Sequence, residues 1–193
     1  MDTTHERNES EAAILAAVAM GDQSAFEDLF HLYEKRLYQY VFTLVNDQTL
    51  AEDIVGETMV AIWRGAGTFS GISRISTWIF GIARHKSLDA LRQSGRRQRE
   101  VDLDGAAELP TPHDNPFDDL ERKQVETLTK RALTALSPEH QEVLRLVFYE
   151  ELPYEEIAAL LAIPANTVKT RVFYAKQQLK KHLERLGQKE PTR

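Results

Sequence analysis

Apolar residues recur at helical spacing along most of this 193-residue chain. Intervals of three and four residues place such side chains on one face of an α-helix. No stretch alternates apolar and polar residues over the length of a strand. The sequence therefore predicts an all-α fold. One long apolar set comprises Phe26, Leu29, Phe30, Tyr33, Leu37, Tyr40, Val41 and Leu44.

A stretch rich in proline and acidic residues interrupts this helical pattern. We expect Ser94-Gly95 to end the preceding helix, because this dipeptide marks turns and loops. The residues that follow have little periodicity and carry mostly acidic charge. We therefore predict two small helical domains, residues 10–97 and 127–187, joined by an acidic linker over residues 98–126.

Three short motifs predict where helices begin. Ser24 and Thr49 each precede a glutamate by three residues, which is the capping-box pattern. Ser137 is a good cap, and Pro138 after it suits the first helical position. Three helices are accordingly expected to start at these residues.

Composition and motif content exclude several classes of protein. The chain has no cysteine, so disulfides, cysteine zinc sites and thiol nucleophiles are excluded. No apolar run reaches the roughly 18 residues of a membrane span, and the polar start MDTTHERNES is not a signal peptide. The histidines are scattered, and no metal-ligand motif or phosphate-binding glycine loop is present. We expect a cytoplasmic protein without membrane insertion, which is not an enzyme and has no metal or cofactor.

The charge of the chain is unevenly distributed. The net charge of −6 argues against nucleic-acid binding, but the location of charge matters more than its sum. Basic residues gather from Arg84 to Arg99 and again from Lys169 to Arg193. Two interpretations stay open, namely two solvated helix faces or two surfaces for a negatively charged partner.

The segment RISTWIFGIARH, residues 74–85, has an apolar and a polar face. Ile75, Trp78, Ile79 and Ile82 are spaced as one helical face and are expected to pack into a core. For Trp78 this position favours the core over a contact with a partner. The outward face is expected to hold Arg74, Thr77, Arg84 and His85.

Residues 154–183 have the pattern of a helix-turn-helix. A short helix is expected to end at Ile163, because the residue before a proline is disfavoured in a helix. A longer helix should begin near Asn166, and such a helix enters the major groove of DNA, where Arg, Lys and Asn read base edges. A plain amphipathic hairpin with a solvated basic face is the alternative. The outward positions of the longer helix are Asn166, Thr167, Lys169, Thr170, Arg171, Phe173, Tyr174 and Lys176.

Motifs in both predicted domains resemble those of bacterial RNA polymerase sigma factors of the extracytoplasmic-function group, in the sigma-70 family. They occur in the family's order and cover most of residues 21–183, except the linker. In the first domain they are Ala51–Glu57, Ala61–Arg64, Phe69–Gly71, Ser76–Arg84 and Asp89–Arg92. In the second they are Leu136–Val143, Tyr154–Ala158 and Thr167–Arg171.

The resemblance implies a protein that binds core RNA polymerase, recognises the −10 and −35 promoter elements and opens the DNA. Asp53 and Glu57, which are four apart and share a helix face, match the family's polymerase-binding surface. The outward face of the longer helix would read the −35 element, and an anti-sigma factor would hold the protein inactive. The residues expected to hold the opened −10 strand are Arg74, Thr77, Trp78, Arg84, His85 and Lys86.

The chain departs from the family pattern at four positions. Gly56 stands where glutamine is often seen, and His85 stands where asparagine is usual, which bears on the polymerase contact and on the −10 base. Ala162 replaces a turn glycine and would be strained at positive φ. Tyr174 stands where arginine is frequent, which suggests an altered −35 preference.

The alternative function is a stand-alone helix-turn-helix transcriptional regulator. It would use residues 154–183 to bind DNA and keep the first domain as a sensor or dimerisation unit. The motifs in residues 51–64 and 76–92 argue against it. The acidic linker fits two roles, a solvated tether or a segment that enters the basic nucleic-acid channels of the polymerase.

Overall fold

The computed structural model describes the backbone of residues 3–100 and 128–187, and within them the side chains of residues 8–94 and 128–186. The described residues form helices and no strand, which confirms the predicted all-α fold. The chain divides into two compact units, Met1–Asp104 and Gly105–Arg193. Most of the predicted linker, residues 101–126, lies outside the described residues.

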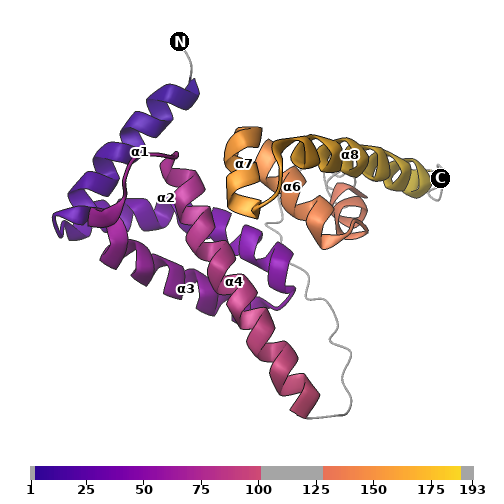
Figure 1. Cartoon of the computed structure of the whole chain (residues 1–193), viewed down its shortest axis with the longest axis horizontal. Coiled ribbons are helices and arrows are strands. Elements are labelled where there is room, and N and C mark those ends of the chain that lie inside the picture. The colour runs from indigo at the N-terminus through magenta and orange to yellow at the C-terminus, as the bar shows by residue number, and fades with distance from the viewer. Residues whose placement is uncertain (1–2, 101–127, 188–193) are drawn as a thin grey trace, which may run out of the picture. The chain divides into compact units, whose positions relative to one another are not determined.

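The described residues of the first unit form four α-helices and one short 3-10 helix (Figure 1). Its second helix packs against the other three α-helices. At the centre, Tyr40 of the second helix and Phe80 of the fourth helix pack edge to face with ring centres 5.1 Å apart. Both side chains are fully buried. The elements are α1 (Thr3–Ala19), α2 (Gln23–Val45), α3 (Gln48–Gly65), η1 (Ala66–Thr68) and α4 (Ile75–Glu100).

A buried polar cluster joins α1 to α2. The Tyr33 hydroxyl donates a 2.7 Å hydrogen bond to Oε2 of Glu11, and the Arg36 guanidinium lies 4.4 Å from the Tyr33 ring centre. Burial, together with the Glu11 charge, raises the pKa of Tyr33 above its ordinary value, so the hydroxyl keeps its proton and remains a donor. Glu11 therefore has the Tyr33 hydroxyl as a donor and the Arg36 guanidinium 3.7 Å away as a counter-charge, as a buried carboxylate requires.

Two of the three predicted helix starts are wrong by two residues. Asp22 caps α2 by accepting the Ala25 N–H at 3.1 Å, so Ser24 already lies inside the helix. Asp47 caps α3 in the same way through the Leu50 N–H. An aspartate caps a helix as well as serine or threonine does. Because Ser24 and Thr49 fit the capping-box pattern, the prediction chose them and missed Asp22 and Asp47. The third prediction is confirmed, because Ser137 caps its helix.

The predicted helix end at Ser94-Gly95 is also wrong, because α4 continues to Glu100. One glycine in a helix interior costs about 1 kcal/mol relative to alanine, which is too little to end a helix that packs on α2 and α3. None of the helices over the described ranges has the length and hydropathy of a membrane span.

The second unit contains the predicted helix-turn-helix. Residues 128–134 form a helix, followed by α6 (Pro138–Phe148), α7 (Tyr154–Leu161) and α8 (Ala165–Gly187). These last three helices contact one another and enclose a small apolar core. Its buried side chains include Val143, Leu146, Ile157, Val168, Val172 and Ala175.

Candidate partner and nucleic-acid interfaces

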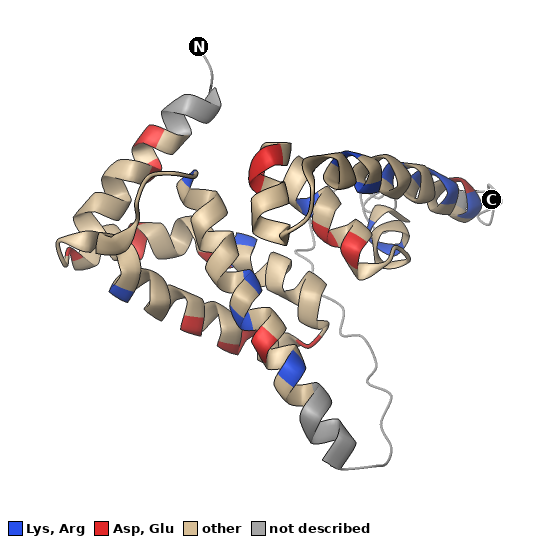
Figure 2. Ribbon diagram, in the orientation of Figure 1, with Lys and Arg blue, Asp and Glu red and all other residues tan. Residues whose placement is uncertain are grey.

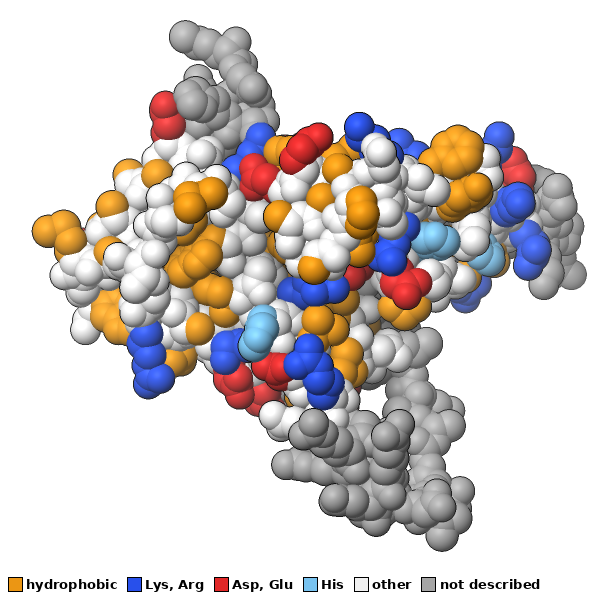
Figure 3. All heavy atoms as spheres, viewed as in Figure 1, with side chains coloured by type: hydrophobic (Ala, Val, Ile, Leu, Met, Phe, Trp, Pro, Cys, Tyr) orange, Lys and Arg blue, Asp and Glu red, His pale blue; other side chains and the backbone are white. Residues whose placement is uncertain are grey.

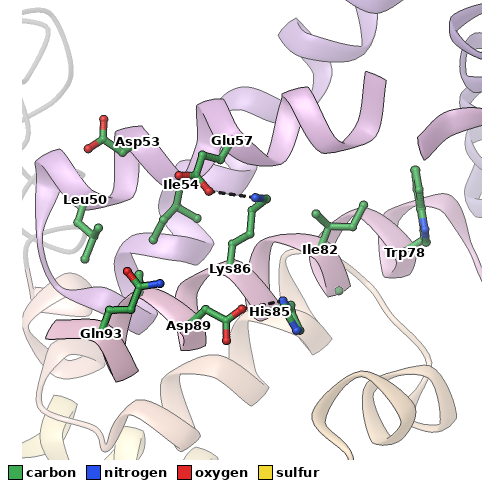
Figure 4. A pocket seen from close by; sticks show the side chains of 12 residues that line it. Leu50, Asp53, Ile54, Glu57, Trp78, Ile82, His85, Lys86, Asp89 and Gln93 are labelled. Atoms are coloured by element: carbon green, nitrogen blue, oxygen red, sulfur yellow. Dashed lines mark hydrogen bonds and ion pairs between the residues drawn. The ribbon is translucent and has the colours of Figure 1, made fainter. Parts of the chain in front are cut away.

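An open groove of about 850 Å³ runs between α3 and α4 in the first unit (Figure 4). The residues predicted for two different partners line this one groove. From α3 it is lined by Leu50, Asp53, Ile54 and Glu57, and from α4 by Trp78, Gly81, Ile82, His85, Lys86, Asp89, Ala90 and Gln93. The predicted polymerase-facing acids therefore lie beside part of the predicted −10 set.

One ion pair crosses the groove. Nζ of Lys86 on α4 lies 3.0 Å from Oε2 of Glu57 on α3, and the two side chains point toward each other (Figure 4). The Glu57 side chain is 65% exposed and that of Lys86 is 26% exposed. An exposed pair of this kind contributes only about 0–1 kcal/mol, so a partner can separate the two charges at small cost.

A second charged cluster follows along α4. Nδ1 of His85 lies 3.1 Å from Oδ2 of Asp89, and Nη1 of Arg92 lies 2.6 Å from Oδ1 of the same residue. The spacings of four and three residues bring all three side chains to one side of the helix. Asp89 was not among the predicted site residues, although these spacings could have revealed it.

The expected orientation of Thr77 is wrong. Its side chain was expected to point outward, but Thr77 is only 8% exposed. The reason is that Phe80, one helical turn later, packs into the core against Tyr40, so this side of α4 faces inward. Ile82, expected in the core, instead is half-buried in the groove.

The other predicted −10 residues remain at least partly accessible. Arg74 and Arg84 are half-buried, and His85 is exposed. Trp78 is neither fully buried nor fully exposed. Its half-buried ring packs on Phe69 with ring centres 5.3 Å apart and also lines the groove.

In the second unit, a tight turn separates α7 from α8. Ala162 caps α7 with φ of +55°, the left-handed conformation that the sequence had raised as a possibility. The Ile163 N–H donates to the Ala158 carbonyl at 3.0 Å, which is typical of a Schellman turn. Alanine is strained in this conformation, because its Cβ approaches the following carbonyl.

The first three turns of α8 present most of the predicted −35 residues to solvent. Val168, Val172 and Ala175 are buried, so the opposite side of the helix faces outward. Basic residues are spaced along this helix (Figure 2), and hydrophobic side chains reach the surface between them (Figure 3). Exposed are Asn166, Lys169, Thr170, Phe173, Tyr174 and Lys176, while Thr167 and Arg171 are half-buried.

Two contacts shape this surface. Phe173 and Tyr174 meet edge to face with ring centres 5.5 Å apart. Nζ of Lys176 lies 4.7 Å from the ring centre of Phe148 on α6, a cation–π distance. Phe148 itself is half exposed. Within the described part of the chain, no cluster of acidic and histidine side chains could hold a metal ion.

The fold and these surfaces define a transcription protein with two helical units, the second of which carries a DNA-binding helix-turn-helix. Residues 29–97 match the model of Sigma-70 region 2, and residues 132–181 match Sigma-70, region 4. The chain belongs to the sigma-70 family, among the ECF RNA polymerase sigma factors.

Similar proteins cover nearly the whole chain. It is 30% identical over 179 residues to the ECF RNA polymerase sigma factor SigL of Mycobacterium tuberculosis, a match that covers 91% of this chain and 98% of SigL. It is 29% identical over 171 residues to the RNA polymerase sigma factor YlaC of Bacillus subtilis, with coverage of 89% and 99%.

The fold is similar to that of a solved sigma factor. In the co-crystal structure of the sigma factor RpoE with the anti-sigma factor NepR from Bartonella quintana, RpoE resembles this chain with a TM-score of 0.63 and 26% identity. The match covers 82% of this chain and 96% of that chain.

Proposed function

We propose that this sigma factor directs core RNA polymerase to promoters by using its two units for different tasks. Residues 10–97 would bind the polymerase and the −10 element, and residues 127–187 would bind the −35 element, with residues 98–126 as the linker. One observation carries the proposal. A single chain combines region 2, which contains the groove, with region 4, which presents the start of α8 to solvent.

The polymerase contact is assigned to the acidic side of α3. Asp53 and Glu57 are exposed, line the groove and lie one helical turn apart. Carboxylates presented in this way suit a basic partner surface. Between them lies the exposed Gly56, which adds no side chain to obstruct the approach of a partner.

The opened −10 strand is assigned to α4 and the residues just before it. Arg74, Arg84 and Lys86 supply positive charge for phosphates, while Trp78 and His85 supply flat rings on which bases stack. Thr77 is left out of this set because it is buried. Lys86 must leave Glu57 before it can bind a phosphate, and the low cost of separating an exposed pair permits this.

The −35 element is assigned to the exposed side of α8. Lys169 and Asn166 lie near its N-terminal end, the part of a recognition helix that meets base edges. Arg171 is half-buried and faces out only in part. Lys180 and Lys181, further along and exposed, suit phosphates.

We also propose that an anti-sigma factor covers these surfaces until a signal releases it. The support is that a similar sigma factor, RpoE, was solved together with the anti-sigma factor NepR. The protein would work in the cytoplasm, where core polymerase and promoters are found. It would act as an initiation factor without catalysis of its own.

Two assays test the proposal. The purified chain is mixed with core polymerase, and co-elution on a sizing column measures binding; run-off transcription on genomic fragments then reveals the promoters. We expect both to be positive. A chain that binds DNA alone and never co-elutes with core polymerase would be a stand-alone regulator instead.

A charge reversal locates the polymerase contact. Asp53→Arg is expected to weaken co-elution with core polymerase while the helical circular dichroism stays unchanged. The matched control is Glu52→Arg, because Glu52 is an exposed acid on the same helix that does not line the groove. Equal behaviour of the two variants would show that the groove side of α3 is not the contact.

A further inference from the structure

Phe148 lies at the C-terminal end of α6 and leaves half of a large apolar side chain exposed. Exposure of this kind sacrifices apolar burial. The ring instead contacts a cation from another helix, because Nζ of Lys176 on α8 lies 4.7 Å from the ring centre. The two residues come from distant parts of the sequence, so the contact depends on how α6 packs against α8. Lys176 is itself exposed, so the contact does not remove it from solvent.

Lys176 has a defined place on the outward side of α8. It follows Lys169 by seven residues, and residues at this spacing lie on the same side of a helix. With a rise of about 1.5 Å per residue, the two lysines are about 10 Å apart along the helix axis, and the major groove of DNA is about 12 Å wide. When Lys169 lies at base edges in the groove, Lys176 therefore lies at the edge of the groove, where the phosphates are.

We propose that Phe148 is a positioning residue, which holds the Lys176 ammonium group at a phosphate beside the −35 element. A lysine side chain is long and flexible, and fixing it on binding costs rotamer entropy. The face of the ring attracts the ammonium group before DNA arrives, so less entropy is lost when the phosphate binds. Phe148 acts through Lys176 and makes no contact of its own with a base.

An aromatic ring suits this task better than a carboxylate does. Lys180, further along α8, shows the difference, because its Nζ lies 3.8 Å from Oε1 of Glu184. That carboxylate repels a phosphate, so Lys180 must leave it before it binds DNA. Phe148 holds its lysine without adding negative charge. This inference rests on the proposed function, because it needs the start of α8 in the major groove, and it adds a residue from outside the recognition helix.

The test measures how tightly the full-length protein, assembled with core polymerase, binds a promoter fragment recovered by run-off transcription. We expect Phe148→Leu to weaken binding about two- to fivefold, which corresponds to the loss of an exposed cation–π contact. Phe148→Tyr should bind normally, because its ring still faces the ammonium group. The matched control is Tyr149→Leu, since Tyr149 is similarly exposed but its ring lies against Arg145 instead. The affinity of this control should stay unchanged.

A double-mutant cycle shows whether Phe148 acts through the lysine. Lys176→Ala should weaken binding and reduce the slope of log affinity against log salt concentration by about 1, as expected for one lost phosphate contact. In that background Phe148→Leu should have no further effect, because the ring has no ammonium group left to hold.

Equal weakening by Phe148→Leu with and without Lys176 would overturn the inference. An unchanged affinity would do the same, and so would tighter binding, which would show that the ring withholds the lysine from DNA. A salt slope that Lys176→Ala leaves unchanged would also overturn it, whatever the stability of the phenylalanine variants. If instead the unaltered protein fails to bind core polymerase, or binds promoters without any need for the −35 element, the proposed function itself fails and the inference with it.

Discussion

Replacing Gly56 with alanine should stabilise the first unit. Gly56 lies in the interior of α3, and a Cβ built on it would meet no atom within 4 Å beyond its chain neighbours and the adjacent backbone of its own helix. The added methyl group therefore brings no clash, and the gain is the lower conformational entropy of the unfolded chain. This gain is about 0.5–1 kcal/mol, which in a domain of this size raises the unfolding midpoint by about 2–8 °C.

The assay is thermal unfolding followed by tryptophan fluorescence. The chain has two tryptophans, Trp63 in α3 and Trp78 in α4, so the signal reports the first unit alone. Gly21→Ala is the matched control, because a Cβ there also meets nothing within 4 Å but the residue has φ of +86°. It should lower the midpoint, since the left-handed conformation costs an L-residue about 1–2 kcal/mol.

The reasoning is refuted if Gly56→Ala leaves the midpoint unchanged or lowers it, or if both variants shift it in the same direction. Binding to core polymerase is measured separately. A more stable variant that binds core polymerase less tightly would show that a partner approaches the backbone closely at Gly56.

Three further predictions concern other parts of the chain. Tyr33→Phe should destabilise the first unit by about 1–3 kcal/mol, because the buried Glu11 loses its hydroxyl donor. Urea unfolding followed by tryptophan fluorescence measures this, and an unchanged urea midpoint would contradict it. Ala162→Gly should stabilise the second unit by about 1 kcal/mol, because glycine relieves the strain of the left-handed conformation. A lower thermal unfolding midpoint, followed by circular dichroism, would contradict the strain at this turn. Lys169→Ala should reduce transcription from promoters that depend on the −35 element and spare those that do not; an equal loss on both would remove Lys169 from base reading.

Much of the fold follows from local patterns in the sequence. The period of apolar residues identifies the helices, since each buries one face, and the proline after Ile163 locates the turn before α8. Helix ends are harder to predict, because several nearby residues can cap equally well. Asp22 and Asp47 took the role expected of Ser24 and Thr49 for this reason.

The site could be predicted only in part. Residue type and spacing selected Glu57 and Lys86 separately, but their ion pair joins positions 29 apart in the sequence. Such a contact depends on how α3 packs against α4, which no local pattern encodes. The burial of Thr77 also depends on helix packing, because Phe80 on the same side of α4 packs against Tyr40 of α2.

The contact between His85 and Asp89 also determines which hydrogen bond the imidazole can offer to a base. Nδ1 faces a carboxylate at 3.1 Å, which only accepts hydrogen bonds, so the neutral ring carries its proton on Nδ1. The other nitrogen, Nε2, is then an acceptor, so it can pair with a donor such as the exocyclic amino group of adenine or cytosine but not with a carbonyl oxygen of any base. An asparagine at this position could present either its oxygen or its amino group, whereas the neutral His85 tautomer is limited to one.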